Sequence, residues 1–408
     1  MHSAPPAHGA RGLLHEDPAM PASRHSPPIC LSTNGRISAS SSEEPTTLLV
    51  ATAEGICAFE RAELGAPWRL RRRDILAGQH PSALLYEPRS GVLFAGLHYQ
   101  GGILASEDCG ESWAPRSTGL ESGHVYTLAA HELGDRVILY AGTEPAMAYR
   151  SEDLGRTWQA LSAMREVPDT DKWWFPHAVP HVKNIAVHPA EPDTLYVCVE
   201  QGDLLKSTDR GRSWRPLTSY ERPGDKFRRD MHRVTFRPGN PREIFLTSGT
   251  GLYYSTDAGE SWTHLMTPES RVGYPDPFFV HPEDENTVFV TGASQNPNPK
   301  WGATGSADPG FLKSSDSGRN WQEAMQGLPH PLRGNIEAAA MHRSPGALEF
   351  FIGTACGEVY ASLDEARSWS LVSGGLPAIS KGPHFRHFLP AEKRREVEEK
   401  LRALKAFA

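Results

Sequence analysis

Short apolar runs separated by turns recur along the chain in groups of four. In one such group the pattern predicts strands over residues 183–187, 194–199, 203–206 and 214–217. The grouping repeats in units of roughly 45 residues, and four short strands in a unit of that length are typical of an all-β repeat architecture. We therefore expect a ring of small sheets, one for each unit.

An eight-residue phrase, Ser-x-Asp-x-Gly-x-Ser/Thr-Trp, marks the same place in successive units. Its aspartate can accept backbone N–H groups across a hairpin turn, its glycine suits a φ that other residues resist, and its tryptophan can anchor the following strand. Asn320 replaces the hydroxyl residue in one copy. Ala366 replaces the glycine in another, which we expect to strain that turn or change its shape. The copies span residues 106–113, 151–158, 207–214, 255–262, 314–321 and 362–369.

A seventh, eroded unit precedes these six. Residues 55–59 match the strand before each phrase and Trp68 matches the tryptophan after it, although the serine and aspartate between them are lost. Seven of the ten tryptophans thus occupy one repeat position. We predict an all-β protein, a single seven-bladed β-propeller of four-stranded blades over residues 29–389, with a disordered leader over residues 1–28.

The tail of the chain departs from this repeat. Val397, Leu401 and Leu404 fall at helical spacing among glutamate, lysine and arginine residues. The spacing predicts a short amphipathic α-helix over residues 390–408, either docked on the side of the ring or used to contact a protein partner.

The repeated phrase resembles the Asp-box, or bacterial neuraminidase (BNR), repeat, and the resemblance covers roughly residues 34–372. It implies a propeller of Asp-box blades like those related to sialidases, photosystem assembly factors and xyloglucan-cleaving glycosidases. A true sialidase is disfavoured because that family is six-bladed and carries an Arg-Ile-Pro motif, whereas Arg36-Ile37 is followed here by Ser38. The xyloglucan-cleaving enzymes place their acidic catalysts between two propellers, and this chain is long enough for one.

Composition limits the classes of partner and the cellular compartment that we expect for this protein. The net charge of -7 arises from mixed signs along the chain with no basic stripe, so nucleic-acid binding is not expected. No apolar run reaches the roughly 18 residues of a membrane span, and the leader lacks the apolar core of a secretory signal. The five cysteines are scattered without a Cys-x-x-Cys pair, which favours a reducing compartment, the cytoplasm.

Candidate chemistry gathers where the inner strand of each blade begins. Counting back seven residues from the turn after each inner strand reaches a column of ring-equivalent positions, and successive blades would point these side chains towards a shared axis. Histidine and carboxylate ligands around an open position suit a divalent metal ion such as Zn, Mn, Fe or Cu. A polar pocket without metal and a purely structural column are the alternatives. The predicted metal ligands are His80, His124, His181 and Asp230, with Tyr274 and Asn335 completing the column.

The loops between the second and third strands open on the same face. His98, Glu144 and Glu200 occupy matching positions in those loops and could add ligands, support the ligands or form an acid–base pair. We predict Glu144, Glu200 and His232 as catalytic residues, and His98 and Arg233 as ligand-binding residues.

Two insertions, residues 167–180 and 294–309, thicken this face. They hold the three tryptophans that the blades do not need, which either stack on a sugar-like or other planar ligand or pack over a gap in the ring. The predicted ligand-binding residues of the insertions are Trp173, Trp174, His177 and Trp301.

Two functions from different classes follow from these features. The first is a sialidase-like propeller enzyme with a funnel-face His/Asp site, metal-assisted, acting on a small polar or carbohydrate-like molecule. The second is a non-catalytic ligand-binding or assembly propeller that uses the insertions and the C-terminal helix to hold a partner. Convergent histidines at one rim favour the enzyme, because a scaffold does not need them.

Overall fold

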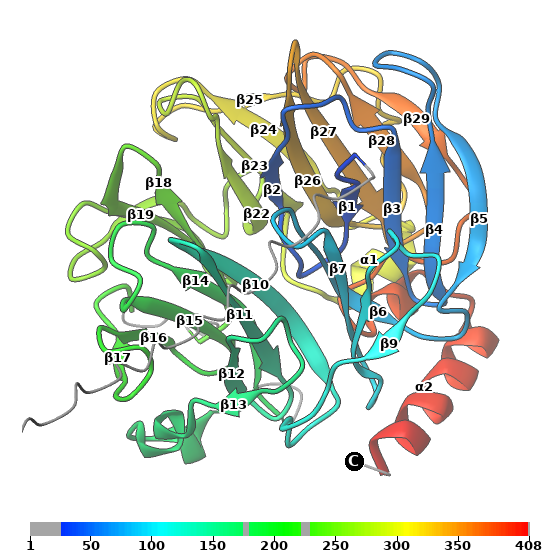
Figure 1. The fold of residues 1–408 in the computed structure, drawn as a ribbon. Coiled ribbons are helices and arrows are strands. Elements are labelled where there is room, and N and C mark those ends of the chain that lie inside the picture. The colour runs from blue at the N-terminus through cyan, green and yellow to red at the C-terminus, as the bar shows by residue number, and fades with distance from the viewer. Residues whose placement is uncertain (1–25, 174–178, 222–228, 407–408) are drawn as a thin grey trace, which may run out of the picture.

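The computed structural model describes residues 26–173, 179–221 and 229–406, with the backbone alone for residue 172 and for residues 400–406. Seven small sheets stand side by side around a common axis, each with its first strand innermost (Figure 1). The predicted all-β seven-bladed propeller with a short C-terminal helix is therefore confirmed. Each sheet is antiparallel and ordered along the chain, apart from two extra strands supplied by the N-terminal segment.

The strands group by blade as follows. Blade 1 comprises β1 (Ile29–Leu31), β3 (Thr47–Thr52), β4 (Gly55–Glu60) and β5 (Arg69–Ile75), and blade 2 comprises β6 (Pro81–Glu87), β7 (Val92–Leu97), β8 (Gly102–Ser106) and β9 (Ala114–Pro115). Blade 3 comprises β10 (Val125–Leu133), β11 (Arg136–Thr143), β12 (Met147–Ser151) and β13 (Gln159–Ala160), and blade 4 comprises β14 (His181–Val187), β15 (Leu195–Glu200), β16 (Leu204–Ser207) and β17 (Arg215–Leu217). Blade 5 comprises β18 (Met231–Arg237), β19 (Asn240–Ser248), β20 (Gly251–Ser255) and β21 (Thr263–Met266). Blade 6 comprises β22 (Tyr274–Val280), β23 (Val288–Ala293), β24 (Gly310–Ser314) and β25 (Gln322–Glu323). Blade 7 comprises β2 (Ser38–Ser40), β26 (Ile336–Ser344), β27 (Ala347–Thr354), β28 (Val359–Ser362) and β29 (Ser370–Ser373).

The N-terminal segment threads the centre of the ring and ties its two ends together. β1 lies parallel to β3 in blade 1, and β2 lies parallel to the inner strand β26 of blade 7. Between them Asn34 N–H donates to Ser82 O (2.9 Å), and the Asn34 carbonyl accepts from Thr127 Oγ1 (2.8 Å). The segment thus satisfies inner-strand groups of blades 2 and 3 that would otherwise face the channel.

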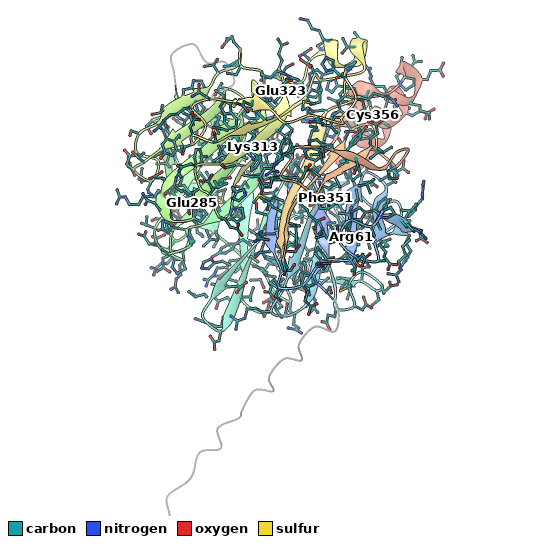
Figure 2. All side chains as sticks on the ribbon, turned by 90° about the horizontal axis from the view of Figure 1, so that it is seen from above. Arg61, Glu285, Lys313, Glu323, Phe351 and Cys356 are labelled. Carbon is teal, nitrogen blue, oxygen red and sulfur yellow. The ribbon has the colours of Figure 1, made fainter. Side chains whose placement is uncertain are left out.

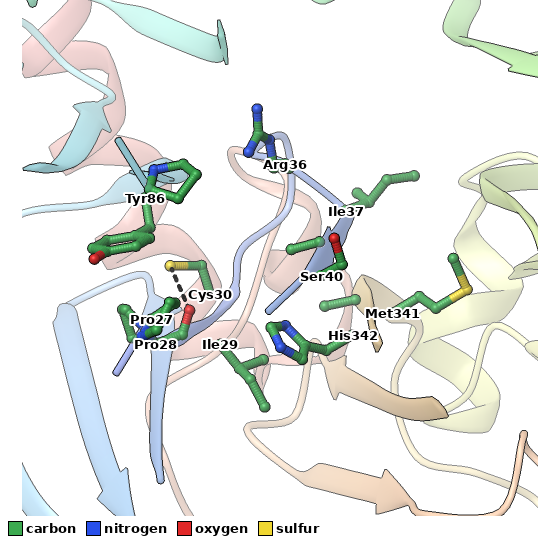
Figure 3. A pocket seen from close by; sticks show the side chains of 13 residues that line it. Pro27, Pro28, Ile29, Cys30, Arg36, Ile37, Ser40, Tyr86, Met341 and His342 are labelled. Atoms are coloured by element: carbon green, nitrogen blue, oxygen red, sulfur yellow. Dashed lines mark hydrogen bonds between the residues drawn. The ribbon is translucent and has the colours of Figure 1, made fainter. Parts of the chain in front are cut away.

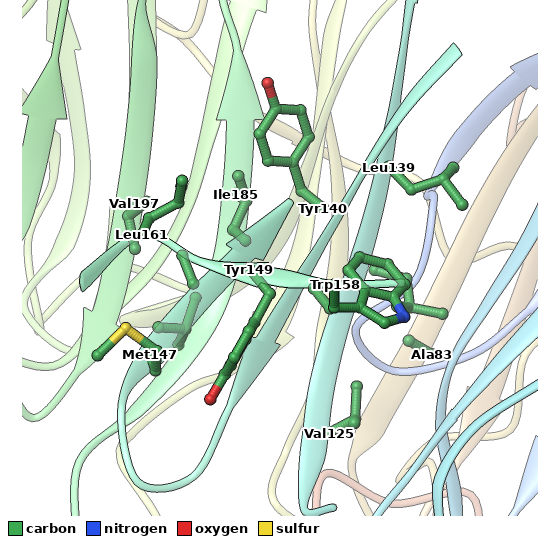
Figure 4. Close-up of a cluster of buried hydrophobic side chains, with 14 of the residues drawn as sticks. Ala83, Val125, Leu139, Tyr140, Met147, Tyr149, Trp158, Leu161, Ile185 and Val197 are labelled. Atoms are coloured by element: carbon green, nitrogen blue, oxygen red, sulfur yellow. The ribbon is translucent and has the colours of Figure 1, made fainter. Parts of the chain in front are cut away.

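Apolar side chains fill the spaces between neighbouring blades, where each buries one face of a sheet against the next. In the largest cluster, Trp158 at the end of the second phrase is 5 % exposed and packs with Tyr140 and Tyr149 of its own blade (Figure 4). Its Nε1 donates to Arg116 O at 2.7 Å, which anchors one blade to the strand end of the previous one. Where blades 1 and 7 meet, Trp68 lies edge-on to Phe351. Phe351 of blade 7 and Arg61 of blade 1 are labelled at this junction in Figure 2.

The repeated phrase forms the turn between the third and fourth strands. In the copy at Ser207, the Asp209 carboxylate accepts from the Ser213 backbone N–H (2.9 Å) and hydroxyl (2.7 Å), while Ser207 Oγ accepts from Gly211 N–H (2.8 Å). Asn320 donates its amide to Asp316 Oδ2 (2.6 Å) in place of a hydroxyl. Ala366 keeps its N–H bond to Ser362 Oγ (2.9 Å) at a φ of +63°, so the turn keeps its shape and the alanine carries the strain of a left-handed backbone.

Helices are few and short. The insertions carry the 3-10 turn η2 (Thr170–Lys172), which follows η1 (Ser162–Glu166), and the helix α1 (Pro299–Thr304). After the last blade come the 3-10 helix η3 (His384–Phe388) and the helix α2 (Ala391–Ala406), which starts from η3 at the side of the ring (Figure 1). Among the residues that the structure describes, no helix combines the length and apolar character needed to cross a membrane.

Candidate functional site

Each inner strand of blades 2 to 7 carries an irregularity near its start that sets the register of the site. The pairing skips one residue, or two in blade 6, so that the skipped side chain leaves the regular alternation. The skipped positions include Ser82, Tyr126, Lys183, His232, Asp276 and Glu337. Each lies two residues after a member of the predicted column, so that column does consist of ring-equivalent positions.

Three predicted residues on blades 2 and 3 form a continuous imidazole chain. His80 lies edge-on to His98, with ring centroids 4.7 Å apart, and His98 Nδ1 shares a hydrogen bond with His124 Nε2 at 3.0 Å. His124 Nδ1 lies 3.6 Å from Glu144 Oε1, and Glu144 Oε2 accepts from the Tyr126 hydroxyl at 3.1 Å. All five side chains are less than 9 % exposed, so water does little to screen their interactions.

His181 joins this chain to blade 4. Its ring stacks on Tyr126, with centroids 3.7 Å apart, and lies between two carboxylates: Nδ1 is 3.9 Å from Glu144 Oε2 and Nε2 is 3.4 Å from Glu200 Oε2. Glu200 also pairs with the ammonium group of Lys183, which is 2 % exposed. Glu144 and Glu200, predicted as catalytic residues, are therefore linked through one imidazole.

The end of the ring at which the inner strands begin is here called the funnel. On its side formed by blades 4 to 7, carboxylates and cations alternate. Asp276 faces three cations: Arg233 Nε at 3.3 Å, Lys183 Nζ at 3.9 Å and Lys381 Nζ at 2.6 Å. Glu337, which is fully buried, accepts from the Lys381 backbone N–H at 2.9 Å. Arg233, predicted to bind ligand, is thus engaged with a carboxylate of the site itself.

The remaining predicted residues of the column sit at the edge of this network. His232 is fully buried, with Nδ1 donating to Pro275 O at 2.8 Å and Nε2 lying 3.3 Å from Asp230 Oδ1. Its ring lies edge-on to Tyr274, with centroids 4.6 Å apart. Asn335 donates its amide to Glu337 Oε1 at 2.8 Å.

The electrostatics of the network follow from burial and pairing. Burial opposes ionisation of Glu200, but Lys183 and His181 outweigh it and hold the pKa of the carboxyl well below its usual range. Burial likewise opposes ionisation of Glu337, yet the neighbouring His384 and Lys381 lower its pKa to about 2. Burial lowers the pKa of His80 to about 4, only partly offset by its contact with Ser380 O. The site therefore combines ionised carboxylates with a neutral imidazole at pH 7.

The geometry gives no support to the predicted metal site. Across residues 26–173, 179–221 and 229–406, no group of three or more histidine, cysteine, aspartate or glutamate residues is arranged to hold a metal ion. The physical reason is visible in the contacts: His98 accepts or donates to His124 directly, and Asp230 engages His232. The ammonium groups of Lys183 and Lys381 already neutralise carboxylates that a metal would need.

The two insertion tryptophans that the structure describes are buried, so neither is exposed for stacking on a ligand. Trp173 is 6 % exposed in the core, and its Nε1 donates to Asp203 Oδ2 at 2.7 Å. Trp301 is 2 % exposed and stacks on Phe388, with ring centroids 5.8 Å apart. Both fit the packing alternative. Trp174 and His177 lie outside the described residues.

Sequence reasoning missed five members of the network: Tyr126, Lys183, Asp276, Glu337 and Lys381. The first four had a signal, because each lies two residues beyond a position in the predicted column. Lys381 had none, since it follows the last blade and no repeat places it. Only the path of the chain after β29 brings it over the funnel.

The opposite end of the channel holds a separate pocket (Figure 3). It is lined by the N-terminal segment and by the far ends of β6 and β26, including Arg36, Tyr86 and His342. His342 Nε2 shares a hydrogen bond with Ser41 Oγ at 2.9 Å, and Cys30 Sγ contacts Pro28 O at 4.0 Å. This pocket contains none of the predicted site residues.

The buried neutral imidazole of His80 predicts a loss of stability in mild acid. An unfolded histidine takes up its proton near pH 6.5 and folded His80 only near pH 4, so stability falls as the pH drops from 6.5 to 4. The shift corresponds to at most about 3 kcal/mol. We would measure the free energy of unfolding by urea denaturation between pH 7.5 and 4. This free energy should fall less steeply with decreasing pH in His80→Gln than in the wild type, by about the contribution of one proton. The exposed His330→Gln should keep the wild-type slope, and an unchanged slope in His80→Gln would contradict the assignment.

Comparison with known proteins places the fold among several groups. The sequence pattern of the family described as "Sortilin, neurotensin receptor 3" matches residues 202–330. Xyloglucanase Xgh74A of Acetivibrio thermocellus is 27% identical over 249 residues, which are 54% of this chain and 28% of that protein. Photosystem II assembly protein Ycf48 of Thermosynechococcus vestitus is 26% identical over 183 residues, covering 44% and 42% of the two chains. The chain spans less than a third of the length of the xyloglucanases it matches.

Solved structures support the same fold. A structure of YCF48 bound to D1 peptide matches with a TM-score of 0.52 at 17% identity, over 86% of this chain and 98% of that one. An ancestral GH74 enzyme matches with a TM-score of 0.52 at 18% identity, over 66% and 34% of the chains. The chain is a seven-bladed β-propeller of the BNR/Asp-box type, related to the GH74 xyloglucanases, to Ycf48 and to the Vps10/sortilin proteins.

Proposed function

We propose that this propeller is an enzyme that performs acid–base chemistry on a small polar, carbohydrate-like molecule at the funnel face. The observation that carries the proposal is the buried chain from His98 through His124 and Glu144 to His181 and Glu200. Burying so many titratable groups is costly for folding, and such clusters concentrate at functional sites. The relation to xyloglucanases supports a sugar-like substrate.

The roles follow from the contacts. Glu144, held by the Tyr126 hydroxyl, orients His124 with Nδ1–H towards the carboxylate, so that Nε2 accepts from His98 Nδ1–H. This arrangement makes His98 a candidate general base, activated by an imidazole and a carboxylate in series. Glu200, kept ionised by Lys183, lies 3.4 Å from His181 Nε2 and orients this imidazole. His232 and Asp230 close the far side of the site.

The test is a comparison of carboxylate variants on soluble saccharides. We would incubate purified full-length protein with xyloglucan oligosaccharides and cello-oligosaccharides and follow product formation by chromatography. Glu144→Gln should lower turnover by about 100-fold, since a general acid–base group contributes about that much. The matched control Glu132→Gln changes an exposed carboxylate at the far end of β10, in the same blade as Glu144, and should leave turnover intact. Equal rates in the two variants, or no turnover of any saccharide, would reject the enzyme.

A binding propeller is the second candidate, and the C-terminal segment favours it. Residues that follow the last blade lie across the funnel and place Ser380 O 3.2 Å from His80 Nε2, so the site can hold a stretch of chain. Saccharide binding without turnover, measured by calorimetry and weakened in Glu144→Gln, would support this function over the enzyme. A protein partner contacting α2 and a cytoplasmic location remain predictions of the sequence.

A further inference from the structure

The segment after the last blade crosses the mouth of the funnel. Its first part is fixed in the fold: Ala378 O accepts from Ala53 N–H at 2.7 Å, and Ile379 is fully buried between blades 7 and 1. Directly after this anchor, Ser380 and Lys381 enter the network, and both are less than 9 % exposed. The chain therefore delivers these two residues to the site from outside the repeat.

Lys381 occupies the site as a ligand would. Its ammonium group donates to Asp276 Oδ2 at 2.6 Å, and its own backbone N–H donates to Glu337 Oε2 at 2.9 Å. Asp276 and Glu337 come from equivalent positions at the irregularities of β22 and β26. Two blades thus present one carboxylate each. Lys381 adds an ammonium to one and a backbone N–H to the other, beside the contacts that the blades themselves supply: Arg233 and Lys183 at Asp276, and Asn335 at Glu337.

The contacts that hold the rest of this segment are weaker than those of a buried core. No residue of η3 is fully buried. His384 Nδ1 lies 3.3 Å from Glu337 Oε2, and the ring of Trp301 stacks on Phe388 and meets His387 edge-on, with centroids 5.8 Å apart in each pair. This histidine–carboxylate contact and these aromatic contacts can open at modest cost while Ile379 stays anchored.

We propose that Lys381 is a tethered pseudo-ligand, and that the Asp276–Glu337 pair is a subsite for a primary ammonium group of the funnel's own ligand. The ligand class is a small molecule with an alkylammonium group beside an N–H or O–H donor, as in an amino sugar. Its binding releases residues 380–389 from the funnel. The inference rests on the proposed function only in that the funnel is a ligand site.

Chemical rescue tests the subsite. Lys381→Ala in the full chain removes the built-in ammonium and should lower the midpoint of thermal unfolding by about 2 °C or more. Added n-butylammonium chloride should restore the midpoint saturably, because it reproduces the lost side chain. Tetramethylammonium chloride at equal ionic strength, which cannot donate a hydrogen bond, should not. In the wild type the same shift should need at least about tenfold more butylammonium, since Lys381 occupies the subsite.

The controls separate this proposal from others. Lys393→Ala, an exposed lysine on α2, should behave as the wild type. If Lys381→Ala does not fold, Lys381→Met takes its place; because it keeps the aliphatic stem and lacks only the ammonium group, the probe is then ammonium chloride instead of butylammonium chloride. Hydrogen exchange of residues 380–389 in the wild type should rise with glucosamine and not with glucose. Equal responses to the two ammonium salts, or exchange unchanged by glucosamine, overturns the proposal. Rescue by butylammonium in a protein that turns over no saccharide would reject the enzyme and keep the subsite.

Discussion

Arg61→Ala should lower the free energy of unfolding by about 3–5 kcal/mol, because it leaves a fully buried carboxylate without its partner. Arg61 follows β4 of blade 1, and Glu349 lies on β27 of blade 7. The guanidinium donates to both carboxylate oxygens, at 2.5 and 2.8 Å, and both side chains are 0 % exposed. Arg61 also donates Nε to Pro45 O at 3.0 Å and lies 4.5 Å from the centre of the Trp68 ring.

Urea denaturation of matched variants checks this prediction. Arg72→Ala removes a half-exposed arginine that pairs with Glu111 of blade 2 and should cost less than about 1 kcal/mol. The double variant Arg61→Met/Glu349→Leu should recover most of the loss, because neither charge is then left buried. A small effect of Arg61→Ala, similar to that of Arg72→Ala, would show that the closure of the ring does not depend on this pair.

Lys183→Met should cost about 3 kcal/mol or more at pH 7, since two buried carboxylates lose a shared cation. The ammonium group pairs with Glu200 and lies 3.9 Å from Asp276 Oδ2. The loss should shrink at low pH. In the wild type the lowered pKa of Glu200 contributes stability that is present above its ordinary pKa of 4.5 and is lost as the pH falls below it. In Lys183→Met this contribution is already reduced at pH 7, so less of it remains to be lost at low pH.

The measurement is urea denaturation of both proteins at pH 7 and pH 4. Lys313→Met, which removes a lysine from a partly exposed pair with Glu365, should change stability by less than about 1 kcal/mol at both values. Lys183→Met/Glu200→Gln should regain part of the loss. A cost for Lys183→Met that is equal at the two pH values would mean that Glu200 does not depend on this ammonium for its ionised state.

The two ion pairs, Arg61–Glu349 and Lys183–Glu200, stabilise different parts of the molecule. Arg61 and Glu349 lie where the first and last blades meet, so their pairing serves ring closure. Lys183 sits among carboxylates and imidazoles that the blades do not need for packing, so its pairing serves the funnel. The fold tolerates the burial of the funnel charges because each lies beside an opposite charge or a hydrogen-bonding partner.

The repeat could be predicted from the sequence because it is a local signal. Each Asp-box turn is closed within eight residues, as Asp209 shows, and each tryptophan packs on the neighbouring strand end, as Trp158 shows. The column of His80, His124, His181 and Asp230 was also found, because equivalent positions of a ring can be counted along the chain. The choice between stacking on a ligand and packing was left open for Trp173 and Trp301, since sequence cannot distinguish an exposed aromatic side chain from one that packs beneath a loop.

By itself the sequence determined the seven four-stranded blades, the turn chemistry and the positions that open each inner strand, because these depend on contacts between residues close in the chain. The tertiary structure alone decided how those positions combine. The inner-strand irregularities place Lys183 beside Asp276, and the tail adds Lys381, which contacts Glu337 and also Asp276, 105 residues away in the chain. Pairings of that range depend on the closed ring and on the path of the tail, and no pattern along the chain encodes either.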